Sequence, residues 1–352
     1  MAREITYAKA ILEATDQCLA ADKSVYIMGL GVTDPKGIFG TTQGLGEKYG
    51  SRAMDMPVAE NGMTGIAIGS ALAGMRPILT HQRVDFMLLS LDQIINNASK
   101  WHYMFGGKMK VPLVIRMIIG RGWGQGPQHS QSLQALFAHI PGLKVVMPTT
   151  PHDAKGLLIS AVEDDNPVIF IEHRWLHNVF GDVPENMYRV KIGEAKKMCE
   201  GDDLTVVSSS YMSLESLRAA EVLKREGVSV EVLDLRTIKP LDEEAIIESV
   251  KKTGRLLVAD NAWKSFGVSA EIIALVSEKA HEALKVAPRR VAFPDIPTPT
   301  SRALANEYYP RAIDIVNSAL RLIGKEEKTE EGLGIIHETP LDVPDKAFTG
   351  PF

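Results

Sequence analysis

Short apolar runs rich in Val and Ile alternate with longer amphipathic stretches along the first half of the chain. Five of these runs predict strands, at residues 25–30, 76–80, 111–119, 143–147 and 168–172. Apolar positions recur every three or four residues between them and predict helices at residues 7–21, 62–73, 88–103 and 152–163. Because the strand runs are continuously apolar, the pattern favours a mostly parallel sheet with helices on both faces.

The same alternation returns beyond residue 200 with shorter elements. Strands are predicted at residues 204–209, 228–233, 255–259 and 290–293, and helices at residues 214–225 and 241–252. Gly227 and Gly254 follow these two helices and suit a left-handed helix end. Residues 178–201 lose the pattern and predict a linker. We therefore predict an α/β fold of two domains, residues 1–190 and 200–324, followed by an extended tail over residues 325–352.

The composition narrows the class of protein. The 352 residues are 45% hydrophobic, which is enough for two cores. A formal charge of −5 with mixed signs predicts no nucleic-acid partner, and no apolar run approaches the roughly 20 residues of a membrane helix. The first residues lack the apolar core of a signal peptide, and Cys18 and Cys199 are too few for a disulfide framework. These features predict a cytoplasmic protein without a membrane partner.

A single acidic residue stands before a glycine-rich helix in residues 56–69 (MPVAENGMTGIAIG). Gly62, Gly65 and Gly69 are three and four residues apart, so they share one helical face that another chain or a ligand can approach closely. Glu60, at the mouth of this helix, is a candidate for chemistry. Its position is explained equally well by a first-turn acid that complements the helix dipole.

A histidine closes a glycine-rich loop at residues 120–129 (GRGWGQGPQH). The loop follows a predicted strand, and open α/β sheets bind their ligands at the carboxyl ends of strands. His129 is therefore a second candidate for chemistry, the alternative being that it caps a helix starting near Ser130. The loop lacks the Gly-Lys-Ser/Thr ending of a phosphate-binding loop, and the glycines at residues 29–31 lack the third glycine of a dinucleotide site.

Several short motifs occur together in one order. Residues 56–69 are followed by DQIIN at 92–96, QHSQ at 128–131, PGLKVV at 141–146, DAKGL at 153–157, DLRTIKPLD at 234–242 and PTP at 297–299. Over residues 4–323 the chain resembles the beta subunit of thiamine-diphosphate-dependent 2-oxo acid dehydrogenases of the pyruvate dehydrogenase type, in the transketolase-like superfamily. The resemblance implies a pyrimidine-binding domain followed by a transketolase C-terminal-like domain.

The resemblance also implies roles for particular residues. Glu60 would bind the aminopyrimidine ring of thiamine diphosphate and promote proton transfer, and Phe86 would stack on the same ring. From residue type alone, Phe86 is explained by core packing. His129 would orient substrate and stabilise charge. A potassium-binding loop of some relatives, which binds largely through backbone carbonyls, aligns with Leu113, Ala161, Val162, Asp164 and Asn166.

Half of the expected cofactor site is missing from the sequence. The chain has no Gly-Asp-Gly followed about 25 to 30 residues later by the Asn ligands that would bind Mg²⁺ and the diphosphate. The resemblance therefore implies an alpha subunit that carries these ligands, in a heterotetramer of two alpha and two beta subunits (α2β2). The glycine face after Glu60 and the second domain would contribute to subunit packing.

The chain departs from the family pattern near the expected site. Leu30 and Gly31 stand where relatives usually carry an acidic pair. His81 and Arg83 lie close to Phe86, and Arg121 lies on the glycine loop, so these three are candidates for substrate recognition. A salt bridge at a subunit interface explains Arg83 equally well.

The leading functional hypothesis is oxidative decarboxylation of a 2-oxo acid with acyl transfer to lipoyl, with a lipoyl acyltransferase core as a further partner. The alternative is half of a split transketolase-like enzyme that transfers a ketol or acyl unit to a sugar or aldehyde without a lipoyl partner. A non-catalytic scaffold is a third hypothesis, which the joint presence of Glu60, Phe86 and His129 disfavours. The sequence does not identify the oxo acid.

Overall fold

The computed structural model describes residues 2–122 and 124–335. Within them a sheet of seven strands runs in the order β12-β6-β7-β5-β4-β2-β3, and all of its pairings are parallel except that of β12 with β6. Its strands are β2 (Val25–Gly29), β3 (Ala53–Met54), β4 (Arg76–His81), β5 (Val114–Ile119), β6 (Lys144–Val146), β7 (Val168–His173) and β12 (Thr237–Lys239).

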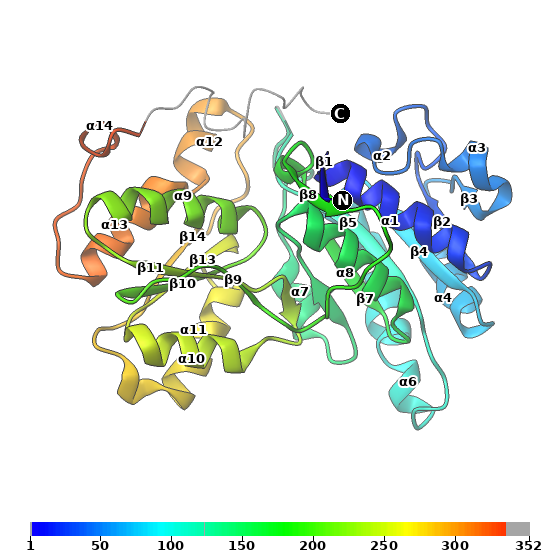
Figure 1. Cartoon of the computed structure of the whole chain (residues 1–352). Helices are drawn as coiled ribbons and strands as arrows, with labels where there is room; N and C mark the ends of the chain where they lie inside the picture. Colours follow the sequence, from blue (N-terminus) through cyan, green and yellow to red (C-terminus); the bar gives the residue numbers. More distant parts are fainter. Residues whose placement is uncertain (1, 123, 336–352) are drawn as a thin grey trace.

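A second sheet of five strands has the order β14-β13-β10-β11-β9. It comprises β9 (Lys196–Cys199), β10 (Leu204–Ser208), β11 (Val230–Asp234), β13 (Leu256–Trp263) and β14 (Arg289–Phe293), and only the edge strand β9 is antiparallel. The predicted α/β fold with two mostly parallel sheets is confirmed. Figure 1 shows the two sheets side by side, each between helices.

Helices cover both faces of each sheet. On the first sheet, α1 (Tyr7–Ala21) and α8 (Pro151–Glu163) share a hydrophobic cluster on one face, and α4 (Glu60–Leu72) and α7 (Gln134–His139) contribute to the cluster on the other. On the second sheet, α9 (Tyr211–Arg225) packs with α13 (Ala312–Leu322), and α10 (Glu243–Thr253) packs with α11 (Val268–Lys279). The other short helical elements are α2 (Gly37–Gly40), α3 (Leu45–Tyr49), α5 (Val84–Met87), α12 (Arg302–Tyr308), α14 (Glu330–Leu333), η1 (Gly50–Arg52), η4 (Arg174–Leu176) and η5 (His281–Ala283).

Local signals explain several helix ends. The Thr6 side chain accepts a hydrogen bond from the backbone N–H of Lys9, which caps the start of α1 at the predicted residue. Thr150 caps α8 in the same way, with Pro151 in the first turn. Gly227 and Gly254 have φ values of +72° and +74°, so both predicted left-handed glycines are confirmed.

The helix predicted over residues 88–103 is wrong as one continuous element. This stretch is divided into η2 (Leu88–Ser90), a π-helical segment η3 (Gln93–Ala98) and α6 (Trp101–Met104). The Ser99 N–H bonds to the carbonyl of Ile94, five residues earlier, which widens the turn. Apolar periodicity does not distinguish this wider turn from an α-helix because the buried residues still face one side.

The predicted linker at residues 178–201 contains two strands. β8 (Phe180–Pro184) pairs antiparallel with β1 (Ala2–Thr6), and β9 is the edge strand of the second sheet. Phe180 in β8 is exposed and β9 is mixed and charged, so neither carries the apolar run of a central strand. The domain boundaries stay a prediction, and most of the predicted tail lies outside the described residues.

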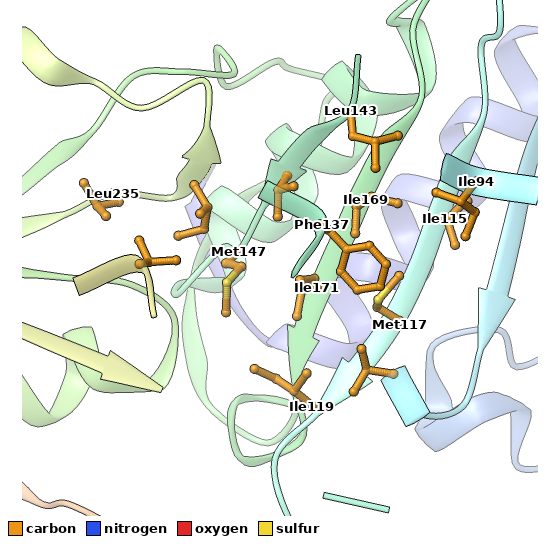
Figure 2. Close-up of a cluster of buried hydrophobic side chains, with 14 of the residues drawn as sticks. Ile94, Ile115, Met117, Ile119, Phe137, Leu143, Met147, Ile169, Ile171 and Leu235 are labelled. Carbon is orange, nitrogen blue, oxygen red and sulfur yellow. The ribbon is translucent and has the colours of Figure 1, made fainter. Parts of the chain in front are cut away.

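One hydrophobic cluster joins the two halves of the chain. Figure 2 shows Phe137 of α7 against Met117 of β5 and Ile171 of β7, with Met147 and Leu235 extending the cluster toward the second sheet. The strand β12, from the second half, completes this connection by pairing with β6 of the first sheet. The β6 side of the first sheet is therefore joined to the second half of the chain.

Candidate active site

Glu60 is the first residue of α4 and is only 7% exposed. Its carboxylate makes no hydrogen bond or ion pair with any residue in the described part of the chain. The helix start is held by its backbone instead, because the Thr64 hydroxyl donates to the carbonyl of Glu60 at 2.8 Å and contacts Ser90 Oγ at 2.9 Å. A buried carboxylate without a partner is costly, so this side chain is suited to receive a donor from a ligand.

The exposed face of α4 fits close approach by another molecule. A Cβ atom added at Gly62 or Gly69 would meet no atom within 4 Å, and Ile66 between them is 58% exposed. Gly62 and Gly69 therefore do not serve packing within the described chain, whereas a Cβ atom at Gly65 would lie 3.5 Å from the Gln93 side chain. Their contribution to subunit packing stays a prediction.

Phe86 lies in α5, just past the carboxyl end of β4, and its ring is half-buried. The ring meets His129 edge-on, with centroids 5.4 Å apart and planes at 88°. His129 is exposed and comes from the loop after β5. The structure thus brings together two of the predicted site residues from neighbouring strands. The predicted alternative for His129 is wrong, because the next helix, α7, begins only at Gln134.

Arg83 precedes α5 and is 2% exposed. Its Nη1 donates to the carbonyl of Gly120 at the end of β5, and its guanidinium lies 5.5 Å from the centre of the Phe39 ring. Nη2 has no hydrogen-bond partner among the described residues. Burial, with a smaller contribution from Arg174, lowers the pKa of Arg83 to about 10, so the side chain remains cationic. Arg83 forms no salt bridge in the described chain, and its role in substrate recognition stays a prediction.

His81, at the end of β4, is 3% exposed, and its Nε2 has no partner among the described atoms. Burial lowers the pKa of His81 to about 4, so the ring is neutral near pH 7. Gln82, the next residue after His81, donates from its side chain to the carbonyl of Leu30 at 3.2 Å. This contact places the Leu30 and Gly31 turn next to the β4 segment.

Arg121 joins the glycine loop to the second half of the chain. It is 1% exposed, and its Nη1 and Nη2 donate to the carbonyls of Pro299 and Thr300, each at 2.7 Å. The indole of Trp175 donates to the carbonyl of Arg121 at 2.6 Å. Through its bonds to Pro299 and Thr300, Arg121 connects the glycine loop to the second half of the chain. Substrate recognition by Arg121 stays a prediction.

Close backbone approach explains two glycines of this loop. Gly120 has a φ of +83°, and a Cβ atom there would lie 2.5 Å from the His173 ring. A Cβ atom at Gly126 would collide with the Thr300 hydroxyl.

Beyond the loop lies an open cavity of about 510 Å³, lined by Pro127, Gln128, Gln131, Trp263, Asp295, Ile296 and Pro297. The cavity lies between the two halves of the chain, and Gln128, next to His129 in sequence, lines it.

Sequence reasoning missed the contact that holds the far end of the loop. The backbone N–H and side-chain Nε2 of Gln131 approach Asp85 Oδ1 at 3.4 and 2.9 Å. Asp85 Oδ2 is buried and has no partner among the described residues. The signals available in the sequence were that Asp85 is adjacent to Phe86 and that Gln131 is the last residue of the QHSQ motif at 128–131.

Two carbonyl oxygens of the predicted potassium loop, those of Val162 and Asp164, lie close together, but they already accept hydrogen bonds. Arg76 Nη1 donates to the carbonyls of Val162 and Asp164 at 3.0 and 3.1 Å. The carbonyls of Leu113 and Ala161 accept backbone N–H groups. Asn166 bonds to the Asp164 carboxylate. The carbonyl oxygens of these four residues therefore accept hydrogen bonds from the Arg76 guanidinium or from backbone N–H groups.

Among residues 2–122 and 124–335, no group of three or more His, Cys, Asp or Glu side chains is arranged to hold a metal ion. No helix in this part of the chain is both long enough and apolar enough to cross a membrane.

The fold and the site define a transketolase-like class of protein. Residues 3–178 match the transketolase pyrimidine-binding domain, and residues 193–315 match the transketolase C-terminal domain. A solved structure described as a split-gene transketolase, an inactive beta4 tetramer, has the same fold, with a TM-score of 0.76 and 22% identity over 91% of this chain and 98% of that one.

Closer relatives specify the family. The chain is 44% identical to the acetoin:2,6-dichlorophenolindophenol oxidoreductase subunit beta of Cupriavidus necator, over 91% of this chain and 97% of the relative. It is 40% identical to the pyruvate dehydrogenase E1 component subunit beta of Rickettsia bellii (91% and 98%) and 41% identical to the mitochondrial subunit of Dictyostelium discoideum (91% and 91%). The chain belongs to this family of thiamine-diphosphate-dependent dehydrogenase beta subunits.

Proposed function

We propose that this chain is the beta subunit of a thiamine-diphosphate-dependent enzyme that oxidatively decarboxylates a 2-oxo acid and transfers the acyl group to lipoyl. The unpartnered carboxylate of Glu60, buried at the start of α4, carries the proposal. It is positioned to accept a hydrogen bond from a ligand, and Phe86 offers a half-buried ring at the same edge of the sheet. The similarity of about 40% to dehydrogenase beta subunits supports the same activity.

The residues present fit one part of the cofactor. Glu60 would bind its aminopyrimidine ring, Phe86 would stack on that ring, and His129 would face the substrate. When bound, thiamine diphosphate supplies a nucleophilic carbon for attack on a carbonyl group. Glu60 would hold a proton at its carboxylate oxygen, and His129, which is exposed beside Phe86, would orient the substrate and stabilise charge.

The ligands for Mg²⁺ and the diphosphate would come from an alpha subunit, in a heterotetramer of two alpha and two beta chains. The name "subunit beta" of the relatives supports such a partner. A lipoyl acyltransferase core would be the acyl acceptor.

A potassium ion would have to share the carbonyl oxygens of Val162 and Asp164 with Arg76, using the second lone pair of each oxygen. A cytoplasmic location stays a prediction, with which the free cysteines Cys18 and Cys199 agree.

The decisive experiment is to produce the chain together with its alpha subunit and to measure two reactions. Carbon dioxide release from 2-oxo acids with lipoyl acylation is expected, and ketol transfer to an aldehyde or sugar phosphate is not. Because the Cupriavidus relative is named for acetoin, acetoin cleavage is measured in parallel. Ketol transfer without carbon dioxide release would establish the split transketolase alternative and would contradict the proposal.

A further inference from the structure

Three residues of the segment from Arg83 to Phe86 contact the chain at three points on or near the loop that carries His129. We call residues 124–131 the histidine loop. Arg83 bonds to the carbonyl of Gly120, where the chain leaves β5. Asp85 accepts hydrogen bonds from Gln131, at the far end of the histidine loop. The Phe86 ring meets His129 itself at 5.4 Å. One short segment after β4 therefore touches the chain before, within and at the end of this loop.

Burial makes the two polar contacts strong constraints. Arg83 is 2% exposed and Asp85 is 9% exposed, so water competes little for either side chain. The aliphatic part of Arg83 is enclosed, and its guanidinium lies against the Phe39 ring. Hydrogen bonds from a charged group are stronger than those between neutral groups, and a low-dielectric environment strengthens them further. His129, in contrast, is exposed, and among the described residues the only contact of its side chain is with the Phe86 ring.

We infer that Arg83 and Asp85 are positioning residues. Arg83 fixes the chain where it leaves β5, before the histidine loop, and Asp85 fixes the far end of the loop, so that His129 stays beside Phe86. The segment Arg83–Phe86 acts as a clamp between the parts of the site carried by β4 and β5. Arg83 thus acts through the carbonyl of Gly120 rather than by contact with the substrate. This inference rests on the proposed function, because it assigns His129 to the active site.

The test compares substitutions in the assembled enzyme with the alpha subunit. Arg83→Gln removes the charged donor and Arg83→Lys keeps a donor of the same charge. Asp85→Ala removes the acceptor for Gln131, whereas Asp85→Asn keeps an oxygen acceptor. Arg52→Gln is the matched control. Arg52 also donates to backbone carbonyls, those of Leu19, Asp22 and Val25, but these lie at the amino end of β2, whereas the site lies at the carboxyl ends of the strands.

A displaced catalytic group lowers the turnover rate more than substrate affinity, and a misplacement near 1 Å costs about 100-fold. Arg83→Gln and Asp85→Ala are each expected to lower kcat by roughly 10- to 100-fold with little change in KM. Amide hydrogen exchange in residues 124–131 is expected to accelerate in both variants. Arg83→Lys and Asp85→Asn recover much of the rate, and Arg52→Gln changes neither kcat nor exchange in the loop. The double variant Arg83→Gln/Asp85→Ala loses less than the product of the two single losses, because both residues hold one loop.

Two results would overturn the inference. A higher KM for the 2-oxo acid in Arg83→Gln with unchanged exchange in the loop would show direct substrate contact. Equal losses of kcat in Arg83→Gln and Arg52→Gln would show a general effect on folding. The proposed function is tested independently of the clamp, because it fails if the unsubstituted complex decarboxylates no 2-oxo acid. In that case amide hydrogen exchange in residues 124–131 still decides whether Arg83 and Asp85 hold the loop.

Discussion

Two buried glutamates of the first half have opposite surroundings. Glu172 in β7 is fully buried and lies 2.7 Å from Arg116 Nε and 3.3 Å from His177 Nε2. Glu60 at the start of α4 is 7% exposed and has no partner among the described residues. Burial raises the pKa of Glu172, but Arg116 and His177 outweigh this effect and hold it below its usual value. The charge of Glu172 is balanced by partners within the fold, whereas Glu60 has no such partner among the described residues, as its proposed contact with a ligand requires.

The largest difference between the two glutamates is expected in turnover. Glu60→Gln should lower kcat of the complex by about 100- to 10,000-fold, the range for loss of a proton-transfer group. The thermal unfolding midpoint should not fall, because the carboxylate has no partner within the described chain, and assembly with the alpha subunit should persist, because Gln has nearly the size of Glu. Steady-state kinetics and analytical ultracentrifugation measure both. Turnover near that of the unsubstituted enzyme would exclude the proton-transfer role.

Glu172→Gln should act on stability instead. It leaves the Arg116 guanidinium buried without its anion, and breaking a buried pair in this way costs about 3–5 kcal/mol. Urea unfolding measures the loss. The double variant Arg116→Met/Glu172→Met is the control, because removing both charges leaves no unpaired ion and should cost less than Glu172→Gln. A loss below about 1 kcal/mol for Glu172→Gln would remove the contrast with Glu60.

A third buried acid, Asp234, extends the comparison, because its protonation makes the free energy of unfolding depend on pH. Burial, reinforced by Asp153, raises the pKa of Asp234 to about 7, although the Ser213 hydroxyl and the Arg236 N–H donate to it. The folded state therefore binds this proton up to about pH 7, whereas the unfolded state releases it near pH 4. The free energy of unfolding should fall by up to a few kcal/mol as pH rises from about 4 to 7.

The variant Asp234→Asn isolates this contribution. Relative to the unsubstituted chain, it should gain stability as pH rises from 5 to 8, and urea unfolding at several pH values measures the difference. His81 acts in the opposite direction, because its lowered pKa destabilises the fold as pH falls from about 6.5 to 4. This effect is common to both proteins and cancels in the difference. A difference that does not vary with pH would mean that Asp234 is ionised throughout.

The local pattern predicted the elements that build the sheets. The helix over residues 7–21 is confirmed because its apolar face and the Thr6 cap are both encoded within one segment. The π-helical turn at Gln93–Ala98 was missed because the spacing of its apolar residues hardly differs from that of an α-helix. The three-residue strand β12 was missed because its partner β6 lies in the other half of the chain.

By itself, the sequence determined the alternation of strands and helices, the family, and the candidate residues Glu60, Phe86 and His129. Only the tertiary structure decided which side chains meet: Phe86 with His129, Arg83 with the Gly120 carbonyl, and Arg121 with the second half of the chain. The physical reason is that burial follows a short local period, whereas hydrogen bonds depend on distances of about 3 Å between segments far apart in sequence. Such distances are set when the loops at the carboxyl edge of the first sheet pack together.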